Sequence, residues 1–236
     1  MIVLFVRASK FCLLVVAMCL ASQAYAQVSK NLAPGFTTRS AASKLVILPV
    51  DMELFSISAG GVREPKADWT QAAVKHFSAG MGKRKELLGA NITELTEKDF
   101  DEFAEVNALH GAVAQSVFLH HMLSSQPLPT KAGALNWSMG DSIKPLKDRT
   151  GADYALFVWI RDTYASPERK AAMVVMAVLG VGLSGGSQTG YASLVDLNDG
   201  RIVWFNDIRR SSGDLREAEP AQETIAALLK GFPVPK

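Results

Sequence analysis

Short apolar runs separate longer stretches of mixed character along this chain. Continuous apolar runs occupy residues 44–50 (KLVILPV) and 153–160 (DYALFVWI), and runs of this length are typical of strands that are covered on both faces. A weaker run at 90–95 (ANITEL) predicts another strand. Between residues 191 and 206, two apolar runs flank Asn198-Asp199-Gly200. An Asp-Gly turn between such runs predicts a β-hairpin.

Stretches with apolar residues at helical spacing lie between these strands. We expect four helices, over 68–88, over 97–124, over 139–150 and from Pro220 onward. Asp68 with Gln71 and Thr96 with Asp99 have the spacing of helix-capping boxes. The polar segment 56–66, which contains two glycines and a proline, predicts a loop.

This alternation of strands and helices predicts an α/β fold. We expect a single domain over residues 44–232, in which a mixed β-sheet is flanked by helices and followed by a carboxyl-terminal β-hairpin and a final helix. Residues 27–43 are polar and lack periodicity, so we interpret them as a loose lead-in. No internal repeat is present.

The most unusual segment is the uncharged apolar run 171–183 (AAMVVMAVLGVGL). It follows Ser166 and Pro167, which fit a helix N-cap and first helical position. The run is too short to cross about 30 Å of hydrocarbon. Two interpretations stay open: an element buried in the core, which is the commoner case, or an exposed apolar insertion over 167–186 that meets a partner or the membrane interface.

The second interpretation assigns an interaction patch to the larger apolar side chains of this run. Its members are Met173, Val174, Val175, Met176, Val178 and Leu179. Methionine is unbranched and adapts to irregular partner surfaces, which favours such a role.

The first 26 residues have the pattern of a secretory signal peptide. Arg7 and Lys10 precede an apolar run over 11–21, and small residues follow at Ala24 and Ala26. We therefore predict cleavage between Ala26 and Gln27, which places the mature chain in the periplasm or outside the cell. A faint lipobox before Cys19 offers an alternative, an outer-membrane lipid anchor, but Met18 stands where that motif needs a small residue.

Removal of this segment changes the charge and the available chemistry. Two of the 25 basic residues and none of the 23 acidic residues lie in the first 26 positions, which leaves 23 of each sign. A neutral balance gives no support for a nucleic-acid partner. Both cysteines, Cys12 and Cys19, also leave with the signal, so the mature chain has no thiol to ligate metal or attack a substrate.

Catalytic and cofactor motifs are incomplete. Residues 182–186 fit G-x-S-x-G, but a hydrolase of that type needs a later histidine, and a strand is expected where its helix should follow. The same glycines fit G-x-G-x-x-G without the helix that a dinucleotide site requires. We predict no enzyme, cofactor or metal site. Four histidines precede the motif: His76, His110, His120 and His121.

Two polar features need separate interpretations. His110 lies within an apolar seam, so we expect a hydrogen-bonded core histidine, and we expect His120 and His121 to face the surface or a loop. Asp51 and Glu53 follow the first strand on one face of an extended segment. Solvated loop carboxylates are the favoured interpretation. The alternative is a small-molecule site or hydrolase cleft formed by Asp51, Glu53 and Arg161.

Three short motifs also suggest a family. They are the strand ending in proline at 45–50, Thr150-Gly151-Ala152-Asp153-Tyr154 leading into a strand, and the hairpin sequence 193–204. Their order resembles the α/β domain shared by the amino-terminal part of TolB, the periplasmic part of the curli secretion lipoprotein and small envelope lipoproteins. The resemblance implies an envelope interaction or assembly module. For such a module we expect an envelope protein partner or a homo-oligomer, and the apolar run 171–183 adds the membrane surface as a further contact.

Overall fold

A mixed β-sheet forms the centre of the computed structural model, which describes residues 29–123 and 125–236. Within these residues the sheet has seven strands: β1 (Leu45–Ile47), β2 (Asp51–Ile57), β3 (Arg63–Pro65), β4 (Ile92–Glu94), β5 (Tyr154–Ala165), β6 (Gly186–Asp196) and β7 (Ile202–Arg210). The α/β class, the mixed sheet and the β6–β7 hairpin are confirmed. The predicted signal peptide, its cleavage site and both cysteines lie outside the described residues.

β1 and β2 pair one after the other with the same edge of β5, and the chain bends between them. β1 pairs with the start of β5 (Leu45↔Tyr154), and β2 pairs with its later part (Asp51↔Trp159), both in parallel. The register between the two pairings shifts by one residue, so the bend at 48–50 accommodates one extra residue. Pro49 lies in this bend and cannot donate to a sheet ladder. The single strand expected over 44–50 is therefore wrong in its second half.

The outer edge of β1 and β2, which faces away from β5, is only partly paired with other strands. β4 pairs with β1 in parallel (Leu45↔Ile92), and β3 pairs with β2 antiparallel (Phe55↔Pro65). The predicted loop over 56–66 is thus a β2–β3 hairpin. Between the ends of β4 and β3, residues 48–53 pair with no strand of the described chain on the edge that faces away from β5.

Ten helical segments connect the strands within the described residues. They are α2 (Ala67–Gly82), α3 (Lys85–Leu88), α4 (Glu97–Phe100), α5 (Ala104–Val117), the π-helix η1 (Phe118–Met122), the 3₁₀ turns η2 (Pro129–Lys131) and η3 (Gly140–Ile143), α6 (Lys144–Thr150), α7 (Pro167–Val178) and α8 (Ala218–Leu228). The expected helix over 68–88 divides after Gly82, and Lys66, not Asp68, is its N-cap. The expected helix over 97–124 breaks at 101–103, although the Thr96–Asp99 capping box is present.

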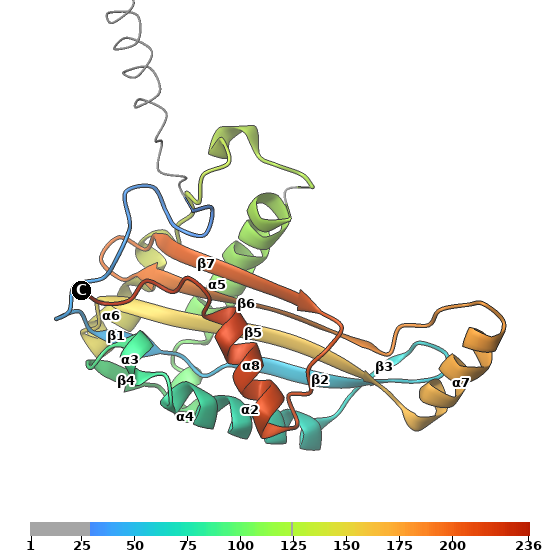
Figure 1. Ribbon diagram of the computed structural model, residues 1–236. Helices are drawn as coiled ribbons and strands as arrows, with labels where there is room; N and C mark the ends of the chain where they lie inside the picture. Colours follow the sequence, from blue (N-terminus) through green and yellow to red (C-terminus); the bar gives the residue numbers. More distant parts are fainter. Residues whose placement is uncertain (1–28, 124) are drawn as a thin grey trace, which may run out of the picture.

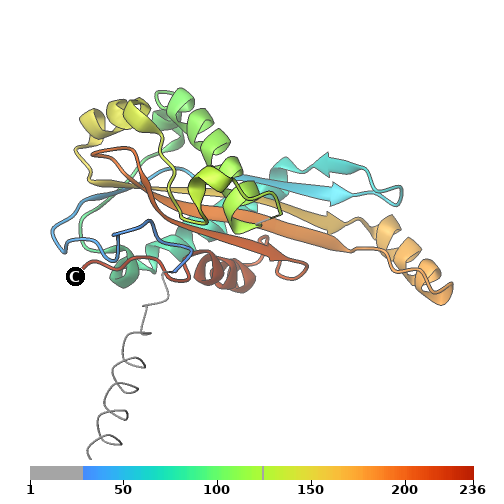
Figure 2. The same ribbon diagram turned by 90° about the horizontal axis from the view of Figure 1, so that it is seen from above.

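The helices cover the two faces of the sheet with separate apolar cores. On one face, α2 and α8 pack on a core that includes Leu54, Ile160 and Ile225. On the other face, α5 and α6 cover a core that includes Phe157 and Phe205. Figure 2 shows the sheet between these two layers. No helix in the described part of the chain is long and apolar enough to cross a membrane.

The segment before β1 contacts both the hairpin and the carboxyl terminus. Ala33 N donates to Val203 O, and Lys236 N donates to Arg39 O. The guanidinium of Arg39 is buried and donates to Leu88 O and Pro233 O. These bonds hold the two ends of the described chain against β7 and α3.

Candidate functional site

α7 projects from the end of the sheet opposite the carboxyl terminus. Figure 1 shows it beyond the ends of β2, β3 and β5, as part of the connection between β5 and β6. Ser166 is its N-cap, and the Ser166 hydroxyl accepts a hydrogen bond from Arg169 N at 3.2 Å. Pro167 occupies the first helical position, as the sequence predicts. Residues 167–178 therefore form an N-capped α-helix and not an irregular loop.

None of the side chains of α7 is buried. Val174, Val175 and Val178 are 67%, 60% and 84% exposed, and Leu179 just after the helix is 69% exposed. The interpretation of 171–183 as a buried core element is therefore wrong. In the structure this run belongs to an exposed insertion. We call these four side chains the apolar patch.

The patch contains four of the seven exposed large apolar side chains in the described residues. Val62, on the β2–β3 turn, and Val181, after α7, lie at the same end of the molecule, whereas Leu119 does not. Val181 belongs to the predicted insertion 167–186 but was not assigned to the patch, and Val62 was not predicted because it is isolated between a glycine and polar residues. Met173 and Met176, which were assigned to the patch, are only half exposed, and the Met173 methyl lies against Gly185.

The base of α7 is fixed to both neighbouring connections by Arg169. Its Nε donates to Ser184 O at 2.8 Å, and its Nη1 donates to Ser58 O at 3.3 Å. The charged residues Glu168, Arg169 and Lys170 thus lie at the base, and the uncharged half of the helix extends away from it. Ser184, the serine of the G-x-S-x-G match, precedes strand β6 and bonds with Gly186, which is not the strand-to-helix turn of a nucleophile elbow.

A second feature is a charged cluster on β2 and β5, directly after the bend at 48–50. Asp51 Oδ1 lies 2.7 Å from Arg161 Nη1, and Glu53 Oε2 lies 3.6 Å from Arg161 Nε. The guanidinium also lies over the Trp159 ring, 4.8 Å from its centroid. Asp51 and Glu53 therefore share one face of β2, as expected, but they are paired strand residues and not free loop carboxylates.

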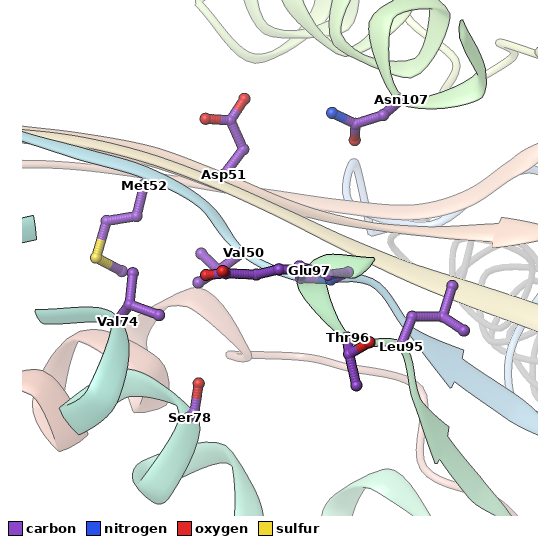
Figure 3. Close-up of a pocket in the computed structure, with 10 residues that line it drawn as sticks. Val50, Asp51, Met52, Val74, Ser78, Leu95, Thr96, Glu97 and Asn107 are labelled. Atoms are coloured by element: carbon purple, nitrogen blue, oxygen red, sulfur yellow. The ribbon is translucent and has the colours of Figure 1, made fainter. Parts of the chain in front are cut away.

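Two adjoining depressions lie next to this cluster. The first has a volume of about 620 Å³ and extends along the bend to α4 and α5, and the second, of about 610 Å³, extends to the start of α2 and to Arg161. They share four lining residues: Asp51, Met52, Val74 and Glu97. Figure 3 shows Asn107 and Val74 on opposite sides of the first depression. Sequence reasoning identified Asp51 but missed Glu97 and Asn107, which are distant from it along the chain.

His110, His120 and His121 each have a polar partner inside the fold. His110 Nε2 lies 2.6 Å from Ser193 Oγ, and its ring stacks on Phe157 at 3.9 Å between centroids. Burial lowers the pKa of His110 to about 3, so the imidazole is neutral. The expected core histidine is confirmed. Of the two alternatives expected for His121, the loop is the correct one: the side chain is buried and not at the surface, and its Nε2 lies 2.7 Å from Lys30 O in the segment before β1.

A buried carboxylate is a further feature that the sequence did not reveal. Asp162 is 2% exposed and accepts hydrogen bonds from Thr163 N, Tyr164 Oη and Gln188 Nε2. Burial raises the pKa of Asp162, while these three donors lower it by a smaller amount. This network joins β5 to β6 beneath α8 and is structural. Among the described residues, no group of three or more histidine, cysteine or acidic side chains is placed to hold a metal ion.

Comparison with known proteins gives no family for this chain. No family model matches it, and no curated protein matches it. Among solved structures, it is similar to the PelC dodecamer from Paraburkholderia phytofirmans (11% identity, 87% of this chain and 95% of that chain, TM-score 0.41). It is also similar to lipoprotein GNA1162 from Neisseria meningitidis (10%, 80% and 94%, TM-score 0.31) and to the LpoB C-terminal domain from Salmonella enterica (10%, 76% and 88%, TM-score 0.27). The resemblance to TolB and to the curli secretion lipoprotein stays a prediction.

Proposed function

We propose that this chain is an exported, non-catalytic assembly module that associates with a second copy of itself through α7. The observation that supports this proposal is the exposure of the apolar patch, whose four side chains are each at least 60% exposed. A contiguous apolar surface of this kind on a folded domain marks an interaction site, because its exposure to water is unfavourable. Export rests on the signal-peptide pattern of the first 26 residues.

The composition of α7 favours a protein partner over a lipid surface. Helices that lie in a membrane interface combine a basic polar face with tryptophan, phenylalanine or leucine on the other face. Residues 171–183 contain neither a charge nor an aromatic ring. Their side chains are mainly small or β-branched, and such side chains suit close packing against another protein surface.

A second copy of the chain is the occupant that best fits the patch. In a two-fold contact the same surface serves both partners, so that surface must be self-complementary. An uncharged apolar patch satisfies this condition because no like charges meet across the axis. The patch also lies at an extreme end of the fold, so two copies can meet there without a clash between their sheets.

Sedimentation velocity across a range of protein concentrations tests the proposal. We expect the mature wild-type chain to form a dimer, and we expect Val175→Ser with Leu179→Ser to be monomeric with an unchanged circular dichroism spectrum. Leu119→Ser is the matched control, since Leu119 is also exposed but lies outside the patch. We expect this control to dimerise normally.

Two results would overturn the proposal. One is a wild-type chain that stays monomeric throughout the concentration series. The other is a doubly substituted chain that dimerises as well as the wild type. Flotation with anionic phospholipid vesicles is the companion measurement: if the wild-type chain floats and the double substitution abolishes flotation while the oligomeric state is unchanged, the patch meets lipid instead.

A further inference from the structure

The outer edge of β2 has main-chain groups that point away from the sheet and meet no strand. Leu54 N donates to Thr70 Oγ1 at 3.0 Å, and Leu54 O accepts from Lys66 N at 2.9 Å, so Leu54 directs its main chain outward. Along a strand, the side to which the main-chain N–H and C=O groups point alternates from one residue to the next, and Met52 lies two residues before Leu54. The N–H and C=O of Met52 therefore point to the same outer side as those of Leu54.

The neighbouring strands end on either side of Met52. At one end, the last ladder bond on this edge runs from Leu95 N to Ile47 O at 2.9 Å. At the other end, Lys66 N bonds to Leu54 O, after which the chain enters α2. Between these two bonds, no strand of the described chain pairs with the outer edge of residues 48–53. An unpaired edge of this kind is a template for another strand.

The two adjoining depressions lie along this same edge. We call them together the edge groove, because both are lined by Met52 and they share Asp51, Val74 and Glu97. One wall is α2, with Val74 and Ser78, and the other is formed by Glu97 and Asn107. Figure 3 shows Asn107 above the chain at Val50, Val74 and Ser78 below it, and Glu97 beside Val50. The groove is therefore elongated along a strand direction, which suits an extended chain better than a compact ligand.

The charge of the groove is negative. Glu97 on α4 lines both depressions and forms no salt bridge with any described residue. It belongs to the acidic segment 94–105, whose other five carboxylates line neither depression. The two cations that line the groove are already paired: Arg161 with Asp51 and Glu53, and Lys66 with Glu64 at 3.4 Å. The carboxylate of Glu97 projects along the groove beside Val50. A chain that enters the groove thus meets uncompensated negative charge on one side.

We propose that the edge groove binds an extended basic segment of a partner polypeptide as an added strand on β2. Strand addition supplies affinity through the main chain and specificity through alternate side chains. The main chain of Met52 would pair with the segment. Side chains at alternate positions would point to Val74 on one face and to Glu97 and Asn107 on the other. The preferred sequence therefore alternates small apolar residues with lysine or arginine.

This inference concerns a surface separate from the apolar patch, so either can fail without the other. The probe is a fluorescein-labelled hexapeptide of alternating lysine and valine, and binding to the mature chain is measured by fluorescence polarisation. We expect saturable binding, and we expect no binding of a glutamate–valine hexapeptide. A lysine–valine peptide that is N-methylated at alternate residues lacks the main-chain donors on one edge, and we expect it to bind about tenfold more weakly.

Substitutions in the protein locate the binding. We expect Glu97→Gln to weaken binding of the lysine–valine peptide about threefold to fivefold, because Glu97 lines both depressions and, unlike Asp51, is not paired with Arg161. Glu105→Gln is the matched control: Glu105 lies in the first turn of α5, in the same acidic segment, and does not line either depression. We expect the control to bind as the wild type does.

Each alternative result would overturn the proposal. Equal binding of the N-methylated and unmodified peptides would show attraction by charge without strand pairing. An equal effect of Glu97→Gln and Glu105→Gln would place the peptide on the acidic surface and outside the groove. Absence of lysine–valine binding by a wild-type chain with a native circular dichroism spectrum would reject a basic extended ligand.

Discussion

His110 on α5 and Ser193 on β6 form a close pair, with Nε2 and Oγ 2.6 Å apart. The same two residue types form the nucleophile and base of many hydrolases. Here His110 is 3% exposed and Ser193 is fully buried. The imidazole stacks on Phe157, and its depressed pKa keeps it neutral. The pair joins helix to sheet inside the core, and we assign it a structural role.

The first prediction concerns the pH dependence of stability. In the unfolded chain His110 titrates near its ordinary pKa of 6.5, whereas burial lowers the folded value to about 3. Between these values the unfolded chain binds a proton that the folded chain excludes. Stability is therefore lost as pH falls below about 6.5, by roughly 1.4 kcal/mol per pH unit.

Urea unfolding at pH 7 and pH 5 measures this effect. We expect His110→Gln, which keeps a nitrogen near Ser193, to reduce the difference between the two pH values by about 2 kcal/mol relative to the wild type. His76→Gln is the control, because His76 is half exposed on α2. A His110→Gln chain with the full wild-type pH dependence would show that His110 titrates normally in the fold.

The second prediction concerns the buried carboxylate of Asp162. Asp162→Ala removes the acceptor for Tyr164 Oη and Gln188 Nε2 in a site closed to water. We expect the free energy of unfolding to fall by about 2–4 kcal/mol, because donors are left unpaired. Asp141→Ala removes only an exposed ion pair with Lys144, and we expect a change within about 0.5 kcal/mol. Equal losses in urea unfolding would contradict the structural role of the network.

The third prediction concerns the turn between β6 and β7. Gly200 has a φ of +74°, and a Cβ there would overlap the main chain of Gly140. Gly133 has a similar φ of +72° but open space around it. We expect Gly133→Ala to cost about 1 kcal/mol through backbone strain alone, and Gly200→Ala to cost at least about 2 kcal/mol more. Thermal unfolding measures both, and similar losses would mean that the turn can move away from Gly140.

The regular parts of the fold follow from local patterns. β5 and the β6–β7 hairpin were predicted because apolar runs and an Asp-Gly turn encode them directly. β3 was missed because Arg63-Glu64-Pro65 is polar and exposed, so its pairing with β2 and not its composition makes it a strand. The bend after β1 was missed for a related reason: the apolar run continues through Pro49, and only the register on β5 reveals the extra residue.

The candidate sites were predicted less completely than the fold. The run 171–183 was recognised, but an apolar run of this length is compatible with a core element, the commoner case, and with a projecting helix, and only the surrounding structure decides. The edge groove combines residues from β2, α2, α4 and α5, which are separated by tens of positions along the chain. No local pattern could predict that Glu97 and Asn107 line the same depression as Met52, because tertiary packing brings them together.

The central claim is that α7 meets a second copy of itself, and a disulfide tests it most directly. Val178 is 84% exposed, and the predicted mature chain has no cysteine, so Val178→Cys introduces a single thiol. The measurement is non-reducing electrophoresis after mild oxidation at micromolar concentration, with Leu119→Cys as the control for random collision. The account predicts a covalent dimer for Val178→Cys and a monomer for the control. A Val178→Cys chain that stays monomeric while its thiol reacts freely with a maleimide would contradict it.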